Sequence, residues 1–210
     1  MKKITALKLQ KRNKNRVNVY LDGEFAAGLS RIVAGWLQIG QEISEEKLAD
    51  LLAKDEVEIA LQRAVNFISL RPRSEKEVRQ NLYKHKTDEE TIQTVLEKLR
   101  RGGLVDDSGF AEMWVENRSE FCPRGRSLLR MELRQKGIQD PVIEDNLQDV
   151  DEGSLAYRAA QKQARKYAHL ERQEFRKKLS GFLARRGFPY AIIYDIIPKI
   201  WEEFSSQQQT

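Results

Sequence analysis

The stretch Glu132-Leu133-Arg134-Gln135-Lys136-Gly137-Ile138 decides the fold, because its pattern returns in the stretch Leu183-Ala184-Arg185-Arg186-Gly187-Phe188. In both, a leucine is followed by basic residues, then by a glycine suited to a helix end, then by an apolar residue that can pack back on the helix. A third leucine, Leu82, keeps the same spacing, since 133 − 82 = 51 and 183 − 133 = 50. A period of this length indicates a repeated structural unit.

Other apolar positions repeat with the same period. Relative to each leucine, an apolar residue stands four positions earlier, an isoleucine ten positions later and another aliphatic residue fourteen positions later. In chain order these sets are Val78, Leu129 and Leu179, then Ile92, Ile143 and Ile193, then Leu96, Leu147 and Ile197. Accidental leucine periodicity is the alternative interpretation, but matches at four positions in three copies argue against it. The first copy has His85-Lys86-Thr87 after its leucine and lacks the glycine.

Each pair of helices follows another amphipathic helix, so the unit has three helices and the chain is expected to have nine. The apolar faces of these leading helices are Ala60, Ala64, Phe67 and Ile68, then Phe110, Ala111, Trp114 and Val115, then Leu155, Ala156, Ala159 and Ala160. We expect three-helix repeats at residues 57–105, 106–152 and 153–210. Because one such unit buries only a small core, we expect the repeats to stack as an elongated tandem array.

Residues 1–29 have a different pattern, in which apolar residues fall at or near alternate positions, as is typical of strands. Asp22-Gly23 is a hairpin signal, and a short third strand is expected around residues 24–27. The pattern predicts a small N-terminal β-meander in a mainly α protein. Residues 30–56 are expected to be a helical connector, which Gly40 interrupts and in which Ser44 is a candidate helix N-cap.

The composition limits the classes to which this chain can belong. With 33% charged and 40% hydrophobic residues, and only eight Phe, six Tyr and three Trp, several small cores fit better than one large core. The formal net charge is +5, and a single cysteine, Cys122, excludes an internal disulfide. The sequence has neither a signal-peptide pattern nor a run of about 18 apolar residues. We therefore expect a cytoplasmic protein without a membrane span.

The sequence offers no convincing catalytic or metal site. His85 and His169 lack a second ligand at metal-binding spacing, and Cys122 has no partner base that the sequence identifies. No glycine-rich phosphate loop is present. The pair Asp106-Asp107 could hold Mg²⁺ in a nuclease, but an aspartate at the start of a helix is also a natural N-cap. We expect a non-enzymatic protein with no cofactor and no catalytic or metal-binding residues.

Basic residues remain as the candidates for function. Residues 154–187 hold ten Lys or Arg against two Glu, whereas residues 140–152 hold six acids and no base. Two turns that contain Pro-Arg lead into helices, where free backbone N–H groups and guanidinium groups together suit phosphate. The candidate DNA- or filament-binding residues are Arg71, Arg73, Arg118, Arg124, Arg126, Arg130, Arg134, Arg176, Lys177, Lys178, Arg185 and Arg186. Those at the two turns, Arg71, Arg73, Arg124 and Arg126, are expected to be exposed. The alternative is that the candidates form interhelical salt bridges or solvated turns.

Five segments carry a resemblance to a known family. They are Leu70-Arg71-Pro72-Arg73-Ser74-Glu75, Leu104-Val105-Asp106-Asp107 followed by Phe110-Ala111 and Trp114, Pro123-Arg124-Gly125, and the two stretches quoted at the outset. In this order they resemble the RecX family, bacterial regulators of the RecA recombinase. The resemblance runs from about Val57 to Trp201. The N-terminal strands lie outside it and are similar to an extension that only some members carry.

The resemblance implies a non-enzymatic protein that binds the RecA filament on DNA, lies along its helical groove, and restrains filament growth, ATP hydrolysis and strand exchange. It also implies contact with single- and double-stranded DNA, and we expect a monomer. It carries over no catalytic residue, so Asp106, Asp107, Phe110 and Trp114 are interpreted as structural. A general basic DNA-binding module that acts without a recombinase is the alternative, although few aromatic residues are interleaved with the basic ones for base stacking.

Overall fold

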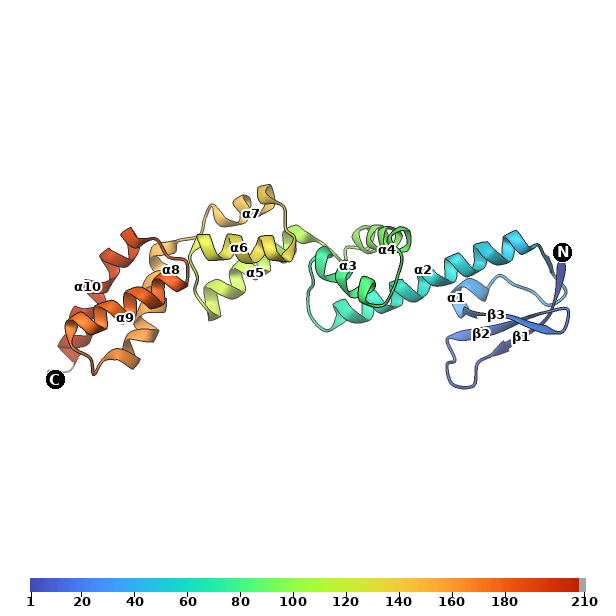
Figure 1. The fold of residues 1–210 in the computed structure, drawn as a ribbon, viewed down its shortest axis with the longest axis horizontal. Helices are drawn as coiled ribbons and strands as arrows, with labels where there is room; N and C mark the ends of the chain where they lie inside the picture. Colours follow the sequence, from blue (N-terminus) through green and yellow to red (C-terminus); the bar gives the residue numbers. More distant parts are fainter. Residues whose placement is uncertain (208–210) are drawn as a thin grey trace. The chain divides into compact units, whose positions relative to one another are not determined.

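The computed structural model describes residues 1–207, which form a small sheet followed by helices (Figure 1). The chain divides into two compact units, Met1–Val105 and Asp106–Thr210. The predicted class, mainly α with a small N-terminal sheet, is confirmed. Within residues 1–207, none of the helices combines the length and the apolar character needed to cross a bilayer.

The sheet of the first unit is antiparallel and has the strand order β3-β2-β1-β4. Its strands are β1 (Lys2–Leu9), β2 (Arg16–Leu21), β3 (Glu24–Ser30) and β4 (Glu42–Ile43). Asp22 and Gly23 have φ angles of 48° and 90°, as a two-residue type I′ hairpin turn requires. The predicted meander is confirmed, and its third strand runs three residues beyond the predicted end. The two-residue β4, which pairs with the start of β1, is an addition that the sequence does not predict.

The connector contains the short helix α1 (Arg31–Ala34) and the first half of the long helix α2 (Glu45–Ser69). Ser44 caps α2 as predicted, because its hydroxyl accepts a hydrogen bond from a backbone N–H of the first turn. Leu51 belongs to the core beneath the sheet, whereas Ala64 belongs to the core of the first repeat. The expected boundary between residues 56 and 57 therefore lies inside one continuous helix. No glycine or proline interrupts these 25 residues.

The first repeat packs α3 (Glu75–Lys84) and α4 (Glu89–Arg101) against the second half of α2 (Figure 1). Its anchor leucine and the three repeated partners are fully buried, namely Leu82, Val78, Ile92 and Leu96. The repeat period therefore marks the positions that fill the core of this repeat.

The turn after α3 has the same backbone form as the glycine turns of the other copies. Lys86 has φ 61°, and the matching glycines Gly137 and Gly187 have φ 88° and 80°. A left-handed conformation at this point satisfies the last carbonyl groups of a helix, and glycine adopts it without steric cost. In the first copy a lysine adopts it instead.

The second unit contains six α-helices and one turn of 3₁₀ helix within its described residues. They are α5 (Asp107–Phe121), α6 (Arg126–Lys136), α7 (Asp140–Leu147), α8 (Glu152–Ala164), η1 (Arg165–Tyr167), α9 (Arg172–Arg185) and α10 (Tyr190–Gln207). The second and third repeats share one continuous hydrophobic core, which runs from Phe110 to Ile200. The anchors Leu133 and Leu183 are fully buried in it.

Two glycines join these two repeats at close range. The backbone N–H of Gly125 donates a hydrogen bond to the carbonyl oxygen of Arg186 at 2.8 Å. A side chain on Gly125 would collide with the carbonyl group of Gly187, and one on Gly187 would lie 2.6 Å from Cβ of Leu128. The turn before α6 and the turn after α9 are therefore locked together. Packing requires glycine at both positions, and at Gly187 the φ of 80° requires it as well.

Candidate nucleic-acid interface

The two candidates of the first repeat lie in the turn before α3 and differ in exposure. Arg71 is exposed, and its Nη2 lies 3.0 Å from Oε1 of Glu77. Arg73 stacks on the ring of Phe67 at 3.9 Å from the centroid, and only 13% of its side chain is exposed. Burial lowers the pKa of the Arg73 guanidinium from its usual value, and Arg71 acts in the same direction. Arg73 is therefore a packing residue, contrary to the expectation that it is exposed.

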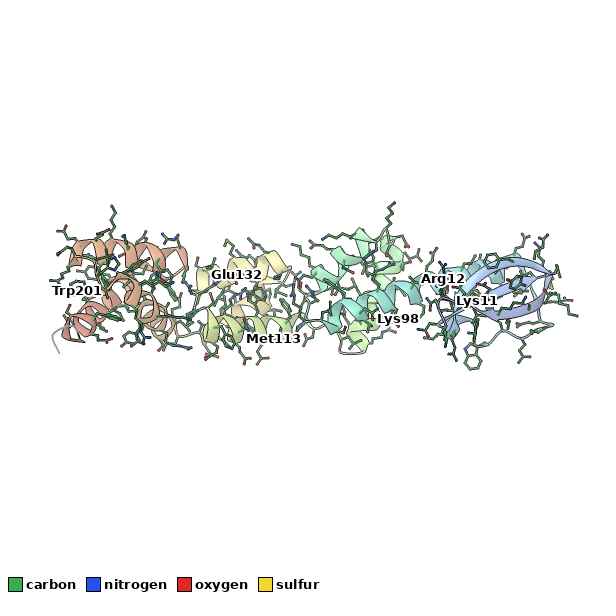
Figure 2. All side chains as sticks on the ribbon, turned by 90° about the horizontal axis from the view of Figure 1, so that it is seen from below. Lys11, Arg12, Lys98, Met113, Glu132 and Trp201 are labelled. Carbon is green, nitrogen blue, oxygen red and sulfur yellow. The ribbon has the colours of Figure 1, made fainter. Side chains whose placement is uncertain are left out.

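Two candidates of the second repeat bind a buried carboxylate. Glu132 on α6, labelled in Figure 2, is only 9% exposed. It accepts hydrogen bonds from Nε1 of Trp114 at 2.9 Å and from Nε of Arg118 at 3.1 Å, and it pairs with Arg124. Arg118 also stacks on Trp114, 4.2 Å from the ring centroid. A buried carboxylate needs such partners, so Arg118 and Arg124 hold the repeat together. Arg124 was expected to be exposed, but its side chain is only 25% exposed.

The remaining candidates of α6 bind the segment that the sequence shows as an acidic run. Arg130 makes a two-pronged pair with Glu144, with N–O distances of 2.6 and 2.8 Å, and Arg134 lies 2.7 Å from Asp140. The hydrogen bonds that the two arginines donate to these carboxylates raise the pKa of both arginines. Arg126 donates from Nη2 to the carbonyl oxygen of Val150 at 2.7 Å. On α6, therefore, the alternative interpretation holds: Arg130 and Arg134 form interhelical salt bridges.

Arg186 belongs to the junction of the second and third repeats. Its Nη1 donates to the carbonyl oxygen of Pro123 at 3.0 Å, and its guanidinium stacks on Phe182 at 4.6 Å from the centroid. It also approaches Sγ of Cys122 at 3.5 Å. Burial opposes ionisation of the Cys122 thiol, but Arg186 and Arg124 outweigh it and lower the pKa. Arg186 therefore stabilises the fold next to the lone cysteine.

The candidates on α9 are different, because most of them point to solvent without an ion-pair partner. Lys178 lies 2.8 Å from Glu174, one turn away on the same helix. Among the residues that the structure describes, Lys177 and Arg185 are exposed and have no carboxylate partner. Arg176 is exposed and lies over the ring of Tyr194, 5.8 Å from its centroid. The structure thus places the freest candidate cations on one helix of the third repeat.

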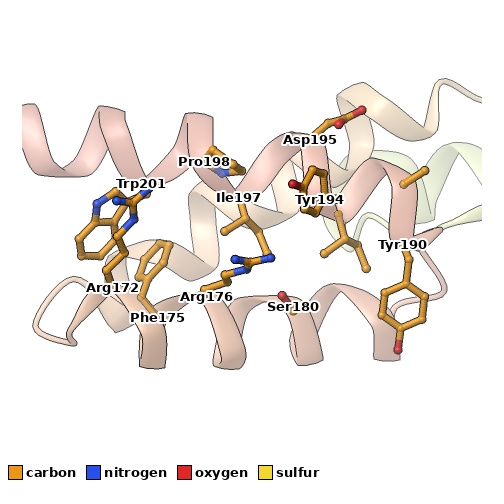
Figure 3. Close-up of a pocket in the computed structure, with 12 residues that line it drawn as sticks. Arg172, Phe175, Arg176, Ser180, Tyr190, Tyr194, Asp195, Ile197, Pro198 and Trp201 are labelled. Atoms are coloured by element: carbon orange, nitrogen blue, oxygen red, sulfur yellow. The ribbon is translucent and has the colours of Figure 1, made fainter.

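A groove of about 730 Å³ opens between α9 and α10 beside these cations (Figure 3). Arg172 and Arg176 line it from α9, and Tyr190 and Tyr194 line it from α10. The two tyrosines are not evident as partners of the basic residues in the sequence, because they stand on the next helix. The sequence signal for this pair is the spacing of four residues between Tyr190 and Tyr194, which puts both rings on one face of a helix.

A second group of free cations lies in the loop between β1 and β2. Lys11, Arg12 and Lys14 are exposed and have no ion-pair partner within the described residues. Figure 2 labels the first two. Arg16, by contrast, is bound to the buried Asp55, 2.8 Å away. The sequence predicts only a polar turn here. It does not reveal that Arg16 pairs with a distant aspartate while Lys11, Arg12 and Lys14 remain unpaired.

The residues considered for catalysis or metal binding do not come together. Among the described residues, no group of three or more His, Cys, Asp or Glu is arranged to hold a metal ion. Asp106 caps α5 by accepting a hydrogen bond from the backbone N–H of Ser108 at 2.9 Å, as predicted from its position. His85 is exposed at the end of α3.

Solved structures with the same fold cover most of the chain. A structure described as the crystal structure of regulatory protein RecX matches with a TM-score of 0.76 and 29% identity, over 95% of this chain and all of that one. The crystal structure of RecX from Lactobacillus salivarius matches with a TM-score of 0.61 and 27% identity, over 70% of this chain and 97% of that one.

Sequence comparisons also find similarity to RecX proteins. Regulatory protein RecX of Bacillus cytotoxicus is 30% identical over 98% of this chain and 80% of its own length. That of Clostridium botulinum strain Alaska E43 is 33% identical over 94% of this chain and 95% of its own. Family models match in chain order: the regulatory protein RecX N-terminal domain at residues 2–44, and the first, second and third RecX three-helix domains at 60–99, 106–147 and 151–197. The chain therefore belongs to the RecX family of regulatory proteins.

Proposed function

We propose that this protein regulates a RecA-type recombinase by binding the recombinase filament on DNA, without catalysing a reaction itself. The proposal includes restraint of filament growth, ATP hydrolysis and strand exchange, by a monomer acting in the cytoplasm. Membership of a family of regulatory proteins supports the regulatory role. The observation that carries the mode of action is the separation of the basic residues into bound and free groups.

Eight of the twelve candidate residues lie outside α9, and each contacts a carboxylate, a carbonyl oxygen or an aromatic ring of the protein, so we assign to them the stabilisation of the repeats. They are Arg71, Arg73, Arg118, Arg124, Arg126, Arg130, Arg134 and Arg186. A cation that already has such partners gains little from binding phosphate. We therefore assign the contact with the polyanion to the exposed cations of α9, above all Lys177 and Arg185, which form no ion pair among the described residues.

The test is a RecA ATPase assay on single-stranded DNA, with and without this protein. We expect hydrolysis to slow at protein concentrations well below those needed to coat free DNA. An unchanged rate would contradict the proposal. Gel-shift binding to the filament at several salt concentrations then tests the surface.

The variant for that second test replaces Lys177 and Arg185 together with alanine. Each lost phosphate contact should reduce the slope of log affinity against log salt by about 1. The matched control replaces Lys84 and Lys98 of the first repeat with alanine. These lysines are also exposed, and the change removes the same charge. Equal losses in the two variants would show that only net charge matters and would remove the assignment to α9.

A general DNA-binding module is the second candidate, and the free cations of the β1–β2 loop favour it. Such a module should bind DNA with the same affinity whether or not a recombinase is present. Comparing the affinity for bare DNA with that for the recombinase filament on the same DNA separates the two functions. A preference for the filament supports regulation of the recombinase, and equal affinity supports the general module.

A further inference from the structure

The groove between α9 and α10 has an apolar floor and a polar rim (Figure 3). Phe175 and Trp201 meet edge to face in the floor, with ring centroids 5.0 Å apart, and Ile197 lies beside them. Phe175 is almost fully buried, so the floor is built from side chains of the shared core. The groove is thus a fixed hollow in the third repeat.

Its upper wall exposes aromatic surface that a folded protein normally covers. Tyr190 is 78% exposed and Tyr194 is 69% exposed. The two stand four residues apart on the first turns of α10, which separates them by about 6 Å along the helix axis. Successive bases of an extended nucleic-acid strand can reach two platforms at such a spacing. Stacking on exposed aromatic rings is how proteins commonly hold unpaired bases.

The opposite wall supplies charge of the sign that a nucleic acid needs. Arg172 and Arg176 on α9 are also four residues apart and line the groove; Arg176 lies over the ring of Tyr194, and Arg172 lies towards the other end, beside Trp201 (Figure 3). Asp195 is the one acid among the described lining residues, so two arginines leave the lining net positive. Two guanidinium groups on one wall and two exposed aromatic rings on the other fit a chain that carries both phosphates and bases.

We propose that this groove binds unpaired nucleotides of a single-stranded nucleic acid, with bases stacked on Tyr190 and Tyr194 and phosphates held by Arg172 and Arg176. The inference rests on the proposed function and gives its polyanion contact a preference for single strands. A duplex cannot use the groove, since its bases are stacked inside the helix. An acidic peptide would need the arginines but would give no role to two exposed rings.

The experiment measures binding of a fluorescent oligo-dT strand and of a duplex of equal length to the full-length protein. We expect Tyr194→Ala to weaken binding of the single strand by about 5- to 150-fold, the range for loss of one stacked base. Tyr194→Phe should stay within about twofold of the wild type because a phenyl ring stacks equally well. Duplex binding should not change in either variant.

Tyr83→Ala is the matched control, because Tyr83 is an exposed tyrosine on α3, outside the groove. Thermal unfolding followed by circular dichroism verifies that each variant is folded. A single-strand affinity that is the same in Tyr194→Ala and in the wild type would overturn the inference. So would an equal loss for single strand and duplex, which would indicate a plain electrostatic effect.

A crosslinking experiment provides an independent readout. An oligonucleotide with 5-iodouracil, irradiated in complex with the wild-type protein, should crosslink to Tyr190 or Tyr194. Crosslinks found only in other parts of the chain would overturn the inference.

The ATPase assay keeps the two proposals apart. If the wild-type protein leaves RecA-dependent hydrolysis unchanged while Tyr194→Ala still loses the single strand selectively, the proposed function fails and the inference holds. If Tyr194→Ala binds bare single strands normally but loses the recombinase filament, the groove contacts protein and the inference fails.

Discussion

Lys86 adopts a left-handed backbone conformation, with φ 61°, at the position where the other two repeats have glycine. A side chain costs about 1 kcal/mol or more in this conformation. Glycine removes that cost but adds freedom to the unfolded chain. We therefore expect Lys86→Gly to raise the free energy of unfolding by about 0.5 kcal/mol.

Urea denaturation of the purified protein measures the effect. Lys84→Gly, two residues earlier at the last position of α3, is the control and should lower the free energy of unfolding by up to about 1 kcal/mol. A loss of stability in Lys86→Gly would mean that the lysine side chain makes a compensating contact.

Gly125 supports the opposite prediction, because a methyl group there would collide with the backbone of Gly187. Overpacking of this kind costs about 1–3 kcal/mol, and here both neighbours are backbone atoms that cannot rotate away. We expect Gly125→Ala to destabilise the second unit by at least this amount. Gly181→Ala is the control in the same unit: its new methyl group would meet only the flexible end of Arg185, at 3.3 Å, within a helix that favours alanine. It should raise the thermal midpoint, whereas Gly125→Ala should lower it.

At the scale of elements, hydrogen bonds and an ion pair hold the ends of the β1–β2 loop, which carries three exposed cations. The backbone N–H of Gln10 donates to the carbonyl oxygen of Arg16 at 3.0 Å, and Arg16 itself is held by Asp55. If the loop contacts a nucleic-acid backbone, replacing Lys11, Arg12 and Lys14 with alanine should reduce the salt slope of DNA binding by up to about 3. Fluorescence anisotropy at a series of salt concentrations measures that slope.

The control for the loop replaces three exposed lysines of the first repeat, Lys76, Lys84 and Lys98, and so removes equal charge. Its slope should fall less. A loop variant whose slope matches that of the wild type would remove the loop from the DNA-binding surface.

The helices were predictable where a buried position repeats, and less so where their ends depend on distant contacts. The anchors Leu82, Leu133 and Leu183 identify one buried face in every repeat, because a helix that packs on a core must present apolar residues at a fixed spacing. The strand β4 was not predictable, since two residues carry no alternating pattern and the strand forms only by pairing with β1. The continuity of α2 across residues 56 and 57 was missed for a related reason: no local signal distinguishes a helix that serves two cores.

The candidate site was predicted as a list of charges, and the sequence could not say which of them are already bound. Arg130 and Glu144 are fourteen residues apart and meet only because α6 and α7 fold back on each other. Glu132 is part of an exposed-looking charged stretch but lies buried among Trp114, Arg118 and Arg124. Pairing depends on tertiary structure, so charge counts overestimate the binding surface.

At the scale of the molecule, each unit has hydrophobic cores of its own. The unit Met1–Val105 contains the core beneath the sheet and that of the first repeat, and the unit Asp106–Thr210 contains the core shared by the second and third repeats. We expect residues 106–210, expressed alone, to unfold in one cooperative transition. Circular dichroism during heating measures it, and Gly125→Ala should lower its midpoint. A broad, non-cooperative melt would show that the shared core is not sufficient for folding.

Helix α2 sets the rotational phase between the sheet and the first repeat, because both pack on the same uninterrupted cylinder. Each residue added near its middle would turn the two cores by about 100° relative to one another and separate them by about 1.5 Å. An insertion of seven residues, close to two full turns, would nearly restore the original phase, and an insertion of two would place the cores on opposite sides. The length of this helix therefore fixes the angle between the sheet and the first repeat. If both are to contact one partner, selection can change that length only by close to whole turns.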